Sequence, residues 1–215
     1  PAQLSASTPG QPTFLGTADL AALTVAQIVA LSSTNTAQLS TAQIVALTAT
    51  QVTALTTAQV AALDTAQLQA LETADIKALT GAQLAGLNTE QISSLTTTQM
   101  AAIDTLDLRS LTNTQMAALT TDQLLALGTP GIRAFTSAQF QALTSDQLPS
   151  LSTTQVAALD TSSIRAISAT EVAALGSDQI TALTTAQMLS FTTDQVAALT
   201  SDQISAVEAT DLKGF

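Results

Sequence analysis

Residues 55–71 read LTTAQVAALDTAQLQAL, and variants of the same eight-residue unit fill nearly the whole chain. We label the octad a to h, so that Thr56 occupies position a and Leu63 position h. From Gly16 to Phe215 the sequence divides into 25 octads without insertion or deletion. Position h is apolar in every copy, and position e is apolar in every copy except at Thr36. The fold must therefore place e and h of each repeat in a common core.

Neither a continuous helix nor a strand explains a period of eight. Eight steps of about 100° leave each copy rotated by roughly 80°, so e and h would spiral around a single long helix. In a strand, residues three apart face opposite sides of the sheet. A short helix that restarts in each octad fits, because e and h are then neighbours on one face. The chain must turn between octads, at position a.

Positions a and d carry the signals of a helix start. Position a is Thr, Ser, Asp, Asn or Gly in every copy except Glu72 and Glu208, which matches the preferences of helix N-caps. Position d is usually Gln. This is the spacing of a capping box, in which the side chains at a and d satisfy each other's main-chain amides. We attribute the preference for Gln over Glu to the repulsion that stacked carboxylates would cause.

The charged residues test this register independently. All 16 acidic residues lie at a, c or d, in the first turn of the expected helix, where the helix dipole favours negative charge. All five basic residues lie at f, in the last turn, where the dipole favours positive charge: Lys77, Arg109, Arg133, Arg165 and Lys213. Pro130 fits a first turn, whereas Pro149 at f predicts a local distortion of its helix.

The sequence predicts an all-α fold. Helices of about seven residues are unstable alone, because nucleation costs more than one or two turns return, so the octads must stack. We expect a solenoid or superhelix of very short helices of one to two turns, one per 8-residue repeat. Residues 1–15 are expected to be a lead-in segment, partly in repeat phase, and residues 16–215 a solenoid of 25 octapeptide repeats. The octad at 32–39 is a decayed copy.

Five octads form a second type, with a base at f and no Gln at d. They begin at Glu72, Asp104, Gly128, Asp160 and Glu208, so their starts lie 32, 24, 32 and 48 residues apart. A superhelical turn of about three to four octads would give these copies an equivalent position in the turn. Their bases could then meet acids on the adjacent turn. Drift within a duplicated subfamily is the alternative explanation.

Composition argues against several classes of function. A formal net charge of −11 with only five basic residues argues against binding to nucleic acid or to anionic membrane surfaces. The chain has no His and no Cys, so the common imidazole, thiol and zinc chemistries are missing. No apolar run is long enough to span a membrane, so we expect no membrane insertion. No signal-peptide pattern is present, and the start at Pro1 suggests a processed product or a segment of a longer protein.

The candidate chemical groups have simpler explanations. The carboxylate pairs Asp104/Asp107 and Glu72/Asp75 are at a spacing that would permit acid–base chemistry, but capping of the first helical turn explains them. We therefore predict that the protein is not an enzyme and has no catalytic, cofactor-binding or metal-site residues and no cofactor. Weak calcium binding stays open. Apolar residues at f indicate either a contact surface or partial burial within the solenoid: Val29, Val45, Leu125 and Leu189.

The octad LTTAQVAA resembles the tandem LTTxQVxAL-type repeats of large repetitive secreted or surface proteins of proteobacteria, some of them adhesins. The resemblance covers the 25 octads, and it implies an extracellular or cell-surface location and a role as a spacer or adhesin-like region. One octad also looks like the opening helix of a TAL-effector repeat. The second helix and base-reading loop of those repeats are missing here, so DNA recognition is not carried over.

From these observations we expect a non-enzymatic structural repeat protein. It would serve as an extended stalk or spacer, or as a filament-forming segment, of a bacterial surface or secreted protein. Its expected partners are other copies of the same repeat, through self-association. The alternative is a superhelical binding scaffold that recognises a peptide or glycan as a surface ligand. Exposed aromatics or an insertion, which usually mark a binding site in a repeat array, are not seen, and this favours the structural role.

The helical assignment is testable on the purified chain. We expect its far-UV circular dichroism to be that of an α-helical protein, because every octad restarts a helix. A spectrum dominated by β-structure would contradict the register that we assign to the octads.

Overall fold

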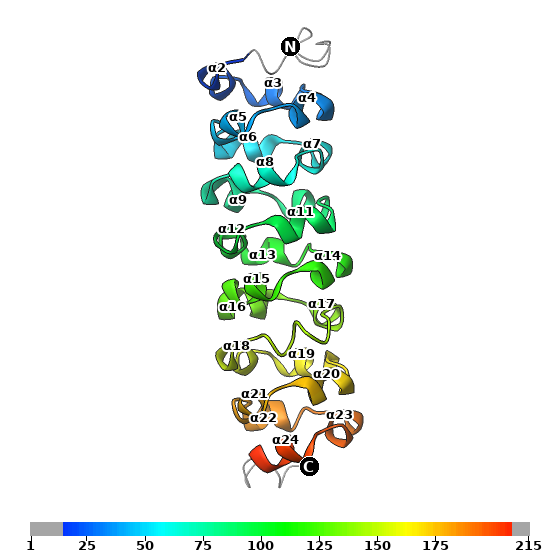
Figure 1. The fold of residues 1–215 in the computed structure, drawn as a ribbon. Helices are drawn as coiled ribbons and strands as arrows, with labels where there is room; N and C mark the ends of the chain where they lie inside the picture. Colours follow the sequence, from blue (N-terminus) through cyan, green and yellow to red (C-terminus); the bar gives the residue numbers. More distant parts are fainter. Residues whose placement is uncertain (1–14, 208–215) are drawn as a thin grey trace. The chain divides into compact units, whose positions relative to one another are not determined.

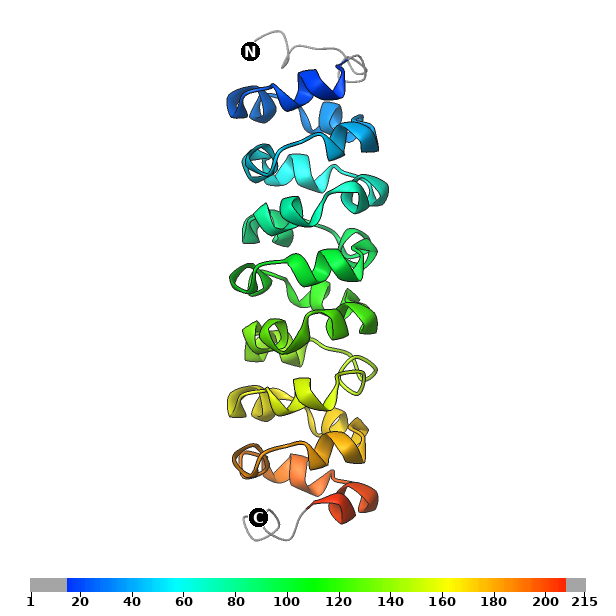
Figure 2. The same ribbon diagram turned by 90° about the vertical axis from the view of Figure 1, so that its left-hand side faces the viewer.

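The computed structural model describes residues 15–207, and all regular structure in this range is helical (Figures 1 and 2). Each octad in the range, except the one at 144–151, forms one helix of four to seven residues. The predicted all-α fold of very short helices, one per octad, is confirmed. Most of the expected lead-in, and the last octad with Lys213, lie outside the described residues.

The chain divides into two compact units, Pro1–Leu111 and Thr112–Phe215, with the boundary between two octads. The helices of the first unit are α2 (Thr17–Ala21), α3 (Val25–Val29), α4 (Ser33–Ala37), α5 (Thr41–Val45), α6 (Ala49–Ala54), α7 (Thr57–Ala61), α8 (Thr65–Ala70), α9 (Thr73–Ala78), α10 (Gly81–Ala85), α11 (Thr89–Ser94), α12 (Thr97–Ala102) and α13 (Thr105–Leu108). Those of the second unit are α14 (Asn113–Ala118), α15 (Thr121–Ala126), α16 (Gly128–Ala134), α17 (Ser137–Gln141), α18 (Thr153–Ala157), α19 (Thr161–Ala166), α20 (Ala169–Ala174), α21 (Ser177–Thr181), α22 (Thr185–Met188), α23 (Thr193–Ala197) and α24 (Ser201–Ala206). A single solenoid over residues 16–215 stays a prediction.

The capping box predicted from positions a and d begins most of these helices. In α7, Gln59 donates its main-chain N–H to Thr56 Oγ1 at 3.2 Å, and Thr56 donates its own N–H to Gln59 Oε1 at 2.8 Å. Two main-chain donors that a helix start leaves unpaired are satisfied by one pair of side chains. Most of the helices end at f or g, and the backbone becomes extended after them, as at Leu71 (position h) with φ −62° and ψ 132°. Each octad is thus one short helix and one turn.

Positions e and h form the core of each unit, as the repeat predicts. Val60 at e is 0% exposed and Leu63 at h is 2% exposed, and almost all equivalent residues are similarly buried. The decayed copy keeps this arrangement with Thr36 at e, because its hydroxyl donates to the main-chain oxygen of Ser32 at 3.0 Å and so avoids an unpaired buried donor. Towards the end of the second unit the pattern weakens, and Ile204 is exposed.

Within each unit, each helix packs on the helix that lies three octads earlier in the sequence. In the first unit α6 packs on α9 and α9 on α12, and in the second α20 packs on α23 and α21 on α24. Figure 1 shows the same stacking for α4 and α7, and for α14 and α17. One turn of the coil therefore holds between three and four octads, as predicted from the spacing of the second octad type.

The Gln at d also joins adjacent turns of the coil. Its Nε2 donates to main-chain oxygens of the octad four units earlier in the sequence. Gln83 Nε2 lies 2.9 Å from the oxygen of Val52 and 2.7 Å from that of Leu55. Gln203 makes the equivalent bonds to Val172 and Leu175, both at 2.8 Å. Repulsion between carboxylates is therefore an incomplete account of the preference for Gln, because the repeat needs an acceptor at one end of this side chain and a donor at the other.

Two octads depart from the regular helix for reasons visible in their sequence. Residues 144–151, which contain Pro149, form a turn in place of a helix, which confirms the predicted distortion. Pro130 lies in the first turn of α16, as predicted. That helix directly follows α15 at Gly128, whose φ of 59° favours glycine. Gly131 is required in the same turn, because a Cβ there would lie 2.7 Å from Leu127 Cβ.

We call the hydrogen bonds from the Gln at d to the previous turn the bridge. The bridge can be tested by replacing the amide of a Gln at d with a carboxylate. Gln83→Glu keeps the acceptor of the capping box but replaces a buried donor by an oxygen facing main-chain oxygens. We expect it to lower the free energy of unfolding by about 3 kcal/mol, measured by denaturant titration.

The reciprocal variant is Glu171→Gln. Glu171 is buried at position d, and its Oε2 accepts from Ser168 N at 2.7 Å. Because a Gln would add a donor toward the octad at 136–143, we expect this variant to raise the free energy of unfolding by about 1–3 kcal/mol. Equal effects of the same sign from both exchanges would contradict a donor role for Nε2.

Candidate functional site

The carboxylate pairs singled out in the sequence lie at helix starts, as their capping role predicts. Asp104 Oδ1 accepts the main-chain N–H of Leu106 at 2.9 Å at the start of α13. Asp75 Oδ2 accepts that of Glu72 at 3.1 Å at the start of α9. Asp107 lies in the first turn of α13. These acids therefore serve as main-chain acceptors near the positive end of each helix dipole.

Asp75 is unusual among these acids because it occupies the buried place of the bridging Gln. Its side chain is 4% exposed. Burial, opposed by the hydrogen bond from the Glu72 main chain and reinforced by the Glu72 carboxylate, raises the pKa of Asp75 above its ordinary value. A Gln at this position would donate to the octad at 40–47, whereas an ionised Asp offers only acceptors. The folded chain thus disfavours the charged form of Asp75.

Two bases of the second octad type line hollows together with acids of the next turn. Lys77 and Asp104 line a hollow of about 460 Å³ on the first unit. Arg133 and Asp160 line a hollow of about 190 Å³ on the second unit. In both cases the acid follows the base by 27 residues, and it opens an octad that lacks Gln at d. Each of these pairs lines one hollow, and pairing of the bases with acids on the adjacent turn stays a prediction.

The bases of the second octad type that the structure describes are divided between the two compact units. Lys77 and Arg109 lie in the first compact unit, and Arg133 and Arg165 lie in the second. In sequence, Thr136 and Thr192 take the acid's place 27 residues after Arg109 and Arg165. Drift within a duplicated subfamily of octads is therefore still the alternative explanation for the second octad type.

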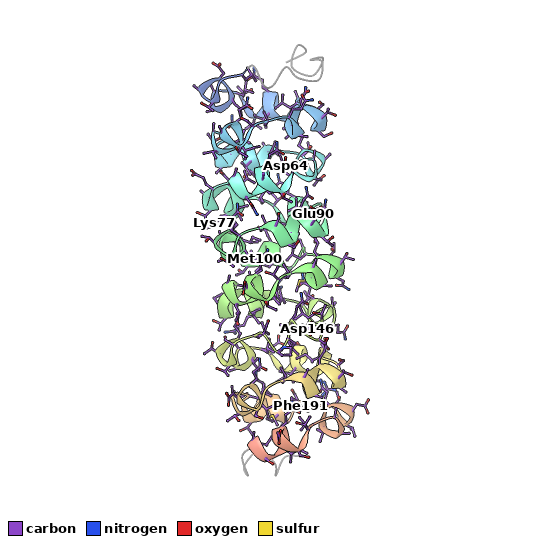
Figure 3. All side chains as sticks on the ribbon, in the orientation of Figure 1. Asp64, Lys77, Glu90, Met100, Asp146 and Phe191 are labelled. Carbon is purple, nitrogen blue, oxygen red and sulfur yellow. The ribbon has the colours of Figure 1, made fainter. Side chains whose placement is uncertain are left out.

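A third hollow has acids but no base. Asp64 and Glu90, both labelled in Figure 3, line a space of about 310 Å³ on the first unit, between the turn that follows α7 and the start of α11. Lys77, also labelled, lies at the outer edge of α9. Hollows between adjacent turns are thus a recurring feature of the surface, and the side chains at a, c and f determine their charge.

The apolar residues at position f are about half exposed. Val29, Val45, Leu125 and Leu189 are between 43% and 52% exposed. Both partial burial and a contact surface remain compatible with this exposure. A larger apolar group, Leu106 at position c of α13, is 74% exposed, and the sequence pattern gave no sign of it because c varies freely.

Sequence reasoning missed the second role of the Gln at d. The signal was present, since a capping box needs only an acceptor at this position and Glu provides one. The strong preference for the amide over the acid indicates a use for its donor, and the register alone did not show where that donor would go.

None of the described helices is long and apolar enough to cross a membrane. Among residues 15–207, no group of three or more His, Cys, Asp and Glu side chains is placed to hold a metal ion.

The fold and its bridges define a tandem-repeat protein built from short helices. The chain belongs to the ALTTAQ repeat family, whose model matches it six times, at residues 14–49, 68–105, 100–130, 124–153, 150–185 and 181–209. These matches span well over half of the chain. A comparison with curated proteins finds no match.

The buried acid at position 75 predicts a pH-dependent stability. A carboxyl whose pKa is raised by folding binds its proton more tightly in the folded chain, so stability falls as the pH rises from the unfolded value of 3.8 through the folded value. Asp75→Asn removes this loss. We expect the variant to be more stable than the wild type at pH 7, with the difference shrinking toward pH 3.8, in thermal unfolding across that range.

Glu90→Gln is the matched control, because it removes one negative charge from an exposed position of the same unit. A stability difference for Asp75→Asn that does not change with pH would contradict this account.

Proposed function

We propose that the chain is a structural, non-enzymatic repeat protein that forms an extended stalk, spacer or filament segment of a bacterial surface or secreted protein. The observation that supports this most is the use of the repeat's own polar groups. The hydroxyl or carboxylate at a and both ends of the Gln at d bond to the main chain of the same protein. A sequence whose recurring polar side chains serve its own stacking is suited to building length.

A second set of bonds supports the same role. At a few octads a polar side chain at f reaches a main-chain oxygen at g of the octad three units later. Thr53 Oγ1 lies 2.9 Å from the oxygen of Ala78, and Gln69 Nε2 lies 2.7 Å from that of Ser94. At these octads, contacts from f add to those of the Gln at d in joining adjacent turns, which suits a spacer. Each turn contacts only its neighbours, so length and stability grow together.

The alternative function is a superhelical binding scaffold of the adhesin type. The hollows between turns favour it, since they bring a base and an acid to the surface in a repeat that is otherwise poor in charge. A peptide or glycan held there would contact side chains at a and f. None of the three described hollows is lined by an exposed aromatic side chain, and this favours the structural role over the scaffold.

Electron microscopy of the purified chain, combined with sedimentation velocity, tests the proposal. We expect rod-like particles, or fibres that lengthen with protein concentration. Compact, nearly spherical monomers at all concentrations would overturn a stalk or filament role. Labelling of intact producing cells with an antibody to the repeats tests the location, and labelling only after lysis would overturn a place at the surface.

A further inference from the structure

One carboxyl group of the second unit is buried in the place of a bridging amide. Glu171, at position d of the octad at 168–175, is 8% exposed, and its side chain has the length of a Gln side chain. Its Oε2 accepts the main-chain N–H of Ser168 at 2.7 Å, and Ser168 Oγ accepts the N–H of Glu171 at 3.2 Å. The capping box of α20 is therefore complete. The carboxyl repeats the acceptor half of the Gln amide, and its second oxygen stands where Gln has its donor.

The neighbouring octads show what this second oxygen faces. Gln187 Nε2 donates to the main-chain oxygens found 31 and 28 residues earlier, those of Val156 at 3.2 Å and Leu159 at 2.7 Å. The same spacing directs the buried carboxyl toward the oxygens of Phe140 and Leu143, which are 1% and 5% exposed. An ionised carboxylate has acceptors only, so it brings oxygen against oxygen at a buried contact between turns. Such a contact is costly unless a hydrogen lies between the two groups.

One proton on the carboxyl supplies that hydrogen. A protonated carboxyl has an O–H donor and keeps a carbonyl oxygen as acceptor, so it matches the amide of Gln at both ends. The hydrogen bond from Ser168 survives, because the carbonyl oxygen still accepts it. What protonation removes is the attraction between a negative charge and the helix start. The cap therefore favours the ionised form of Glu171, and the contact with the previous turn favours the protonated form.

The charged groups around Glu171 do not compensate its charge. The helix α23, which packs on α20, carries Asp194, and the octad three units earlier carries Asp146, both exposed. The octad at 136–143, which provides the acceptors, has no charged residue. No described Lys or Arg forms an ion pair with Glu171. The octads directly before and after it in the sequence carry three further charges, all exposed: Asp160, Arg165 and Asp178.

We propose that Glu171 is a proton-dependent bridge between two turns of the second unit. When it is protonated, it donates to the octad at 136–143 and closes the contact as Gln does. When it is ionised, it caps its own helix only, and the two turns are held there by apolar packing. Acid then tightens this contact, whereas a carboxyl that served only as a cap would lose stability in acid. This inference is independent of the stalk role.

Thermal unfolding of the full chain at several pH values, with wild type beside Glu171→Gln, tests the proposal. The variant restores the residue of the regular octads, so it is expected to fold. We expect its Tm to exceed that of the wild type by at least about 2 °C near pH 7. The gap should close as the pH falls toward about 4, where Glu takes up a proton. Because both chains contain Asp75, its own pH dependence cancels in this comparison.

Asp178→Asn is the matched control, since it removes one exposed negative charge from the neighbouring helix of the same unit. We expect it to show no stabilisation at any pH. A gap between Glu171→Gln and the wild type that widens in acid would overturn the proposal, because Glu171 would then act only as a cap. A gap that stays constant with pH would overturn it as well.

Gln155→Glu is the second arm and places the same group at a regular octad. Gln155 Nε2 donates to the oxygen of Leu124 at 2.9 Å, and its Oε1 accepts from Ser152 N at 2.9 Å. We expect this variant to unfold at a lower Tm than the wild type near neutral pH and to regain most of the difference in acid. A loss of Tm that acid leaves unchanged or increases would contradict a donor role for the protonated carboxyl.

Discussion

The carboxamide of the Gln at position d is the group on which the fold of each unit depends. One end of it completes the start of its own helix, and the other end donates to the main chain of the turn before, as Gln83 does with Thr80 and with Leu55. Helices this short have no stability of their own, and each needs both its cap and a neighbour. Because a single planar group satisfies both needs, local structure and stacking form together. The Gln amide provides an acceptor and a donor at this distance from the backbone at any ordinary pH, whereas a carboxyl must first bind a proton to donate.

Much of the fold follows from the sequence because the octad is regular and its signals agree. The cap at Thr56, the pair Val60 and Leu63, and the distortion at Pro149 all follow from propensity and spacing, and the structure confirms them. The donor side of the Gln could not be predicted in the same way. Its acceptors lie 28 to 31 residues away, and which carbonyls they are depends on how far the coil advances in one turn, which no local pattern specifies.

The exceptions at position d are more informative than the regular copies. Asp75, Ser163 and Glu171 are all buried at the position that the Gln amide occupies in the regular octads. They differ in what they present to the main-chain oxygens of the previous turn. Asp75 and Glu171 bring a carboxylate to face acceptors, whereas Ser163 leaves a hollow. These places were hard to recognise from sequence, because a substitution that still caps its helix looks conservative until the other end of the side chain is considered. Each of these exceptions at position d therefore changes a contact between turns.

The targets of the bridging amides are main-chain oxygens, which every octad presents alike. Such a contact does not distinguish one octad from another, so a turn that stacks one octad out of step would recover nearly all of its bonds. Misaligned stacking is then the main competitor of the native coil during folding. The copies that break the pattern distinguish one octad from another, as Thr36 does by filling a core place that elsewhere takes a larger apolar group. The irregular octads therefore help to set the register in which the otherwise interchangeable octads stack.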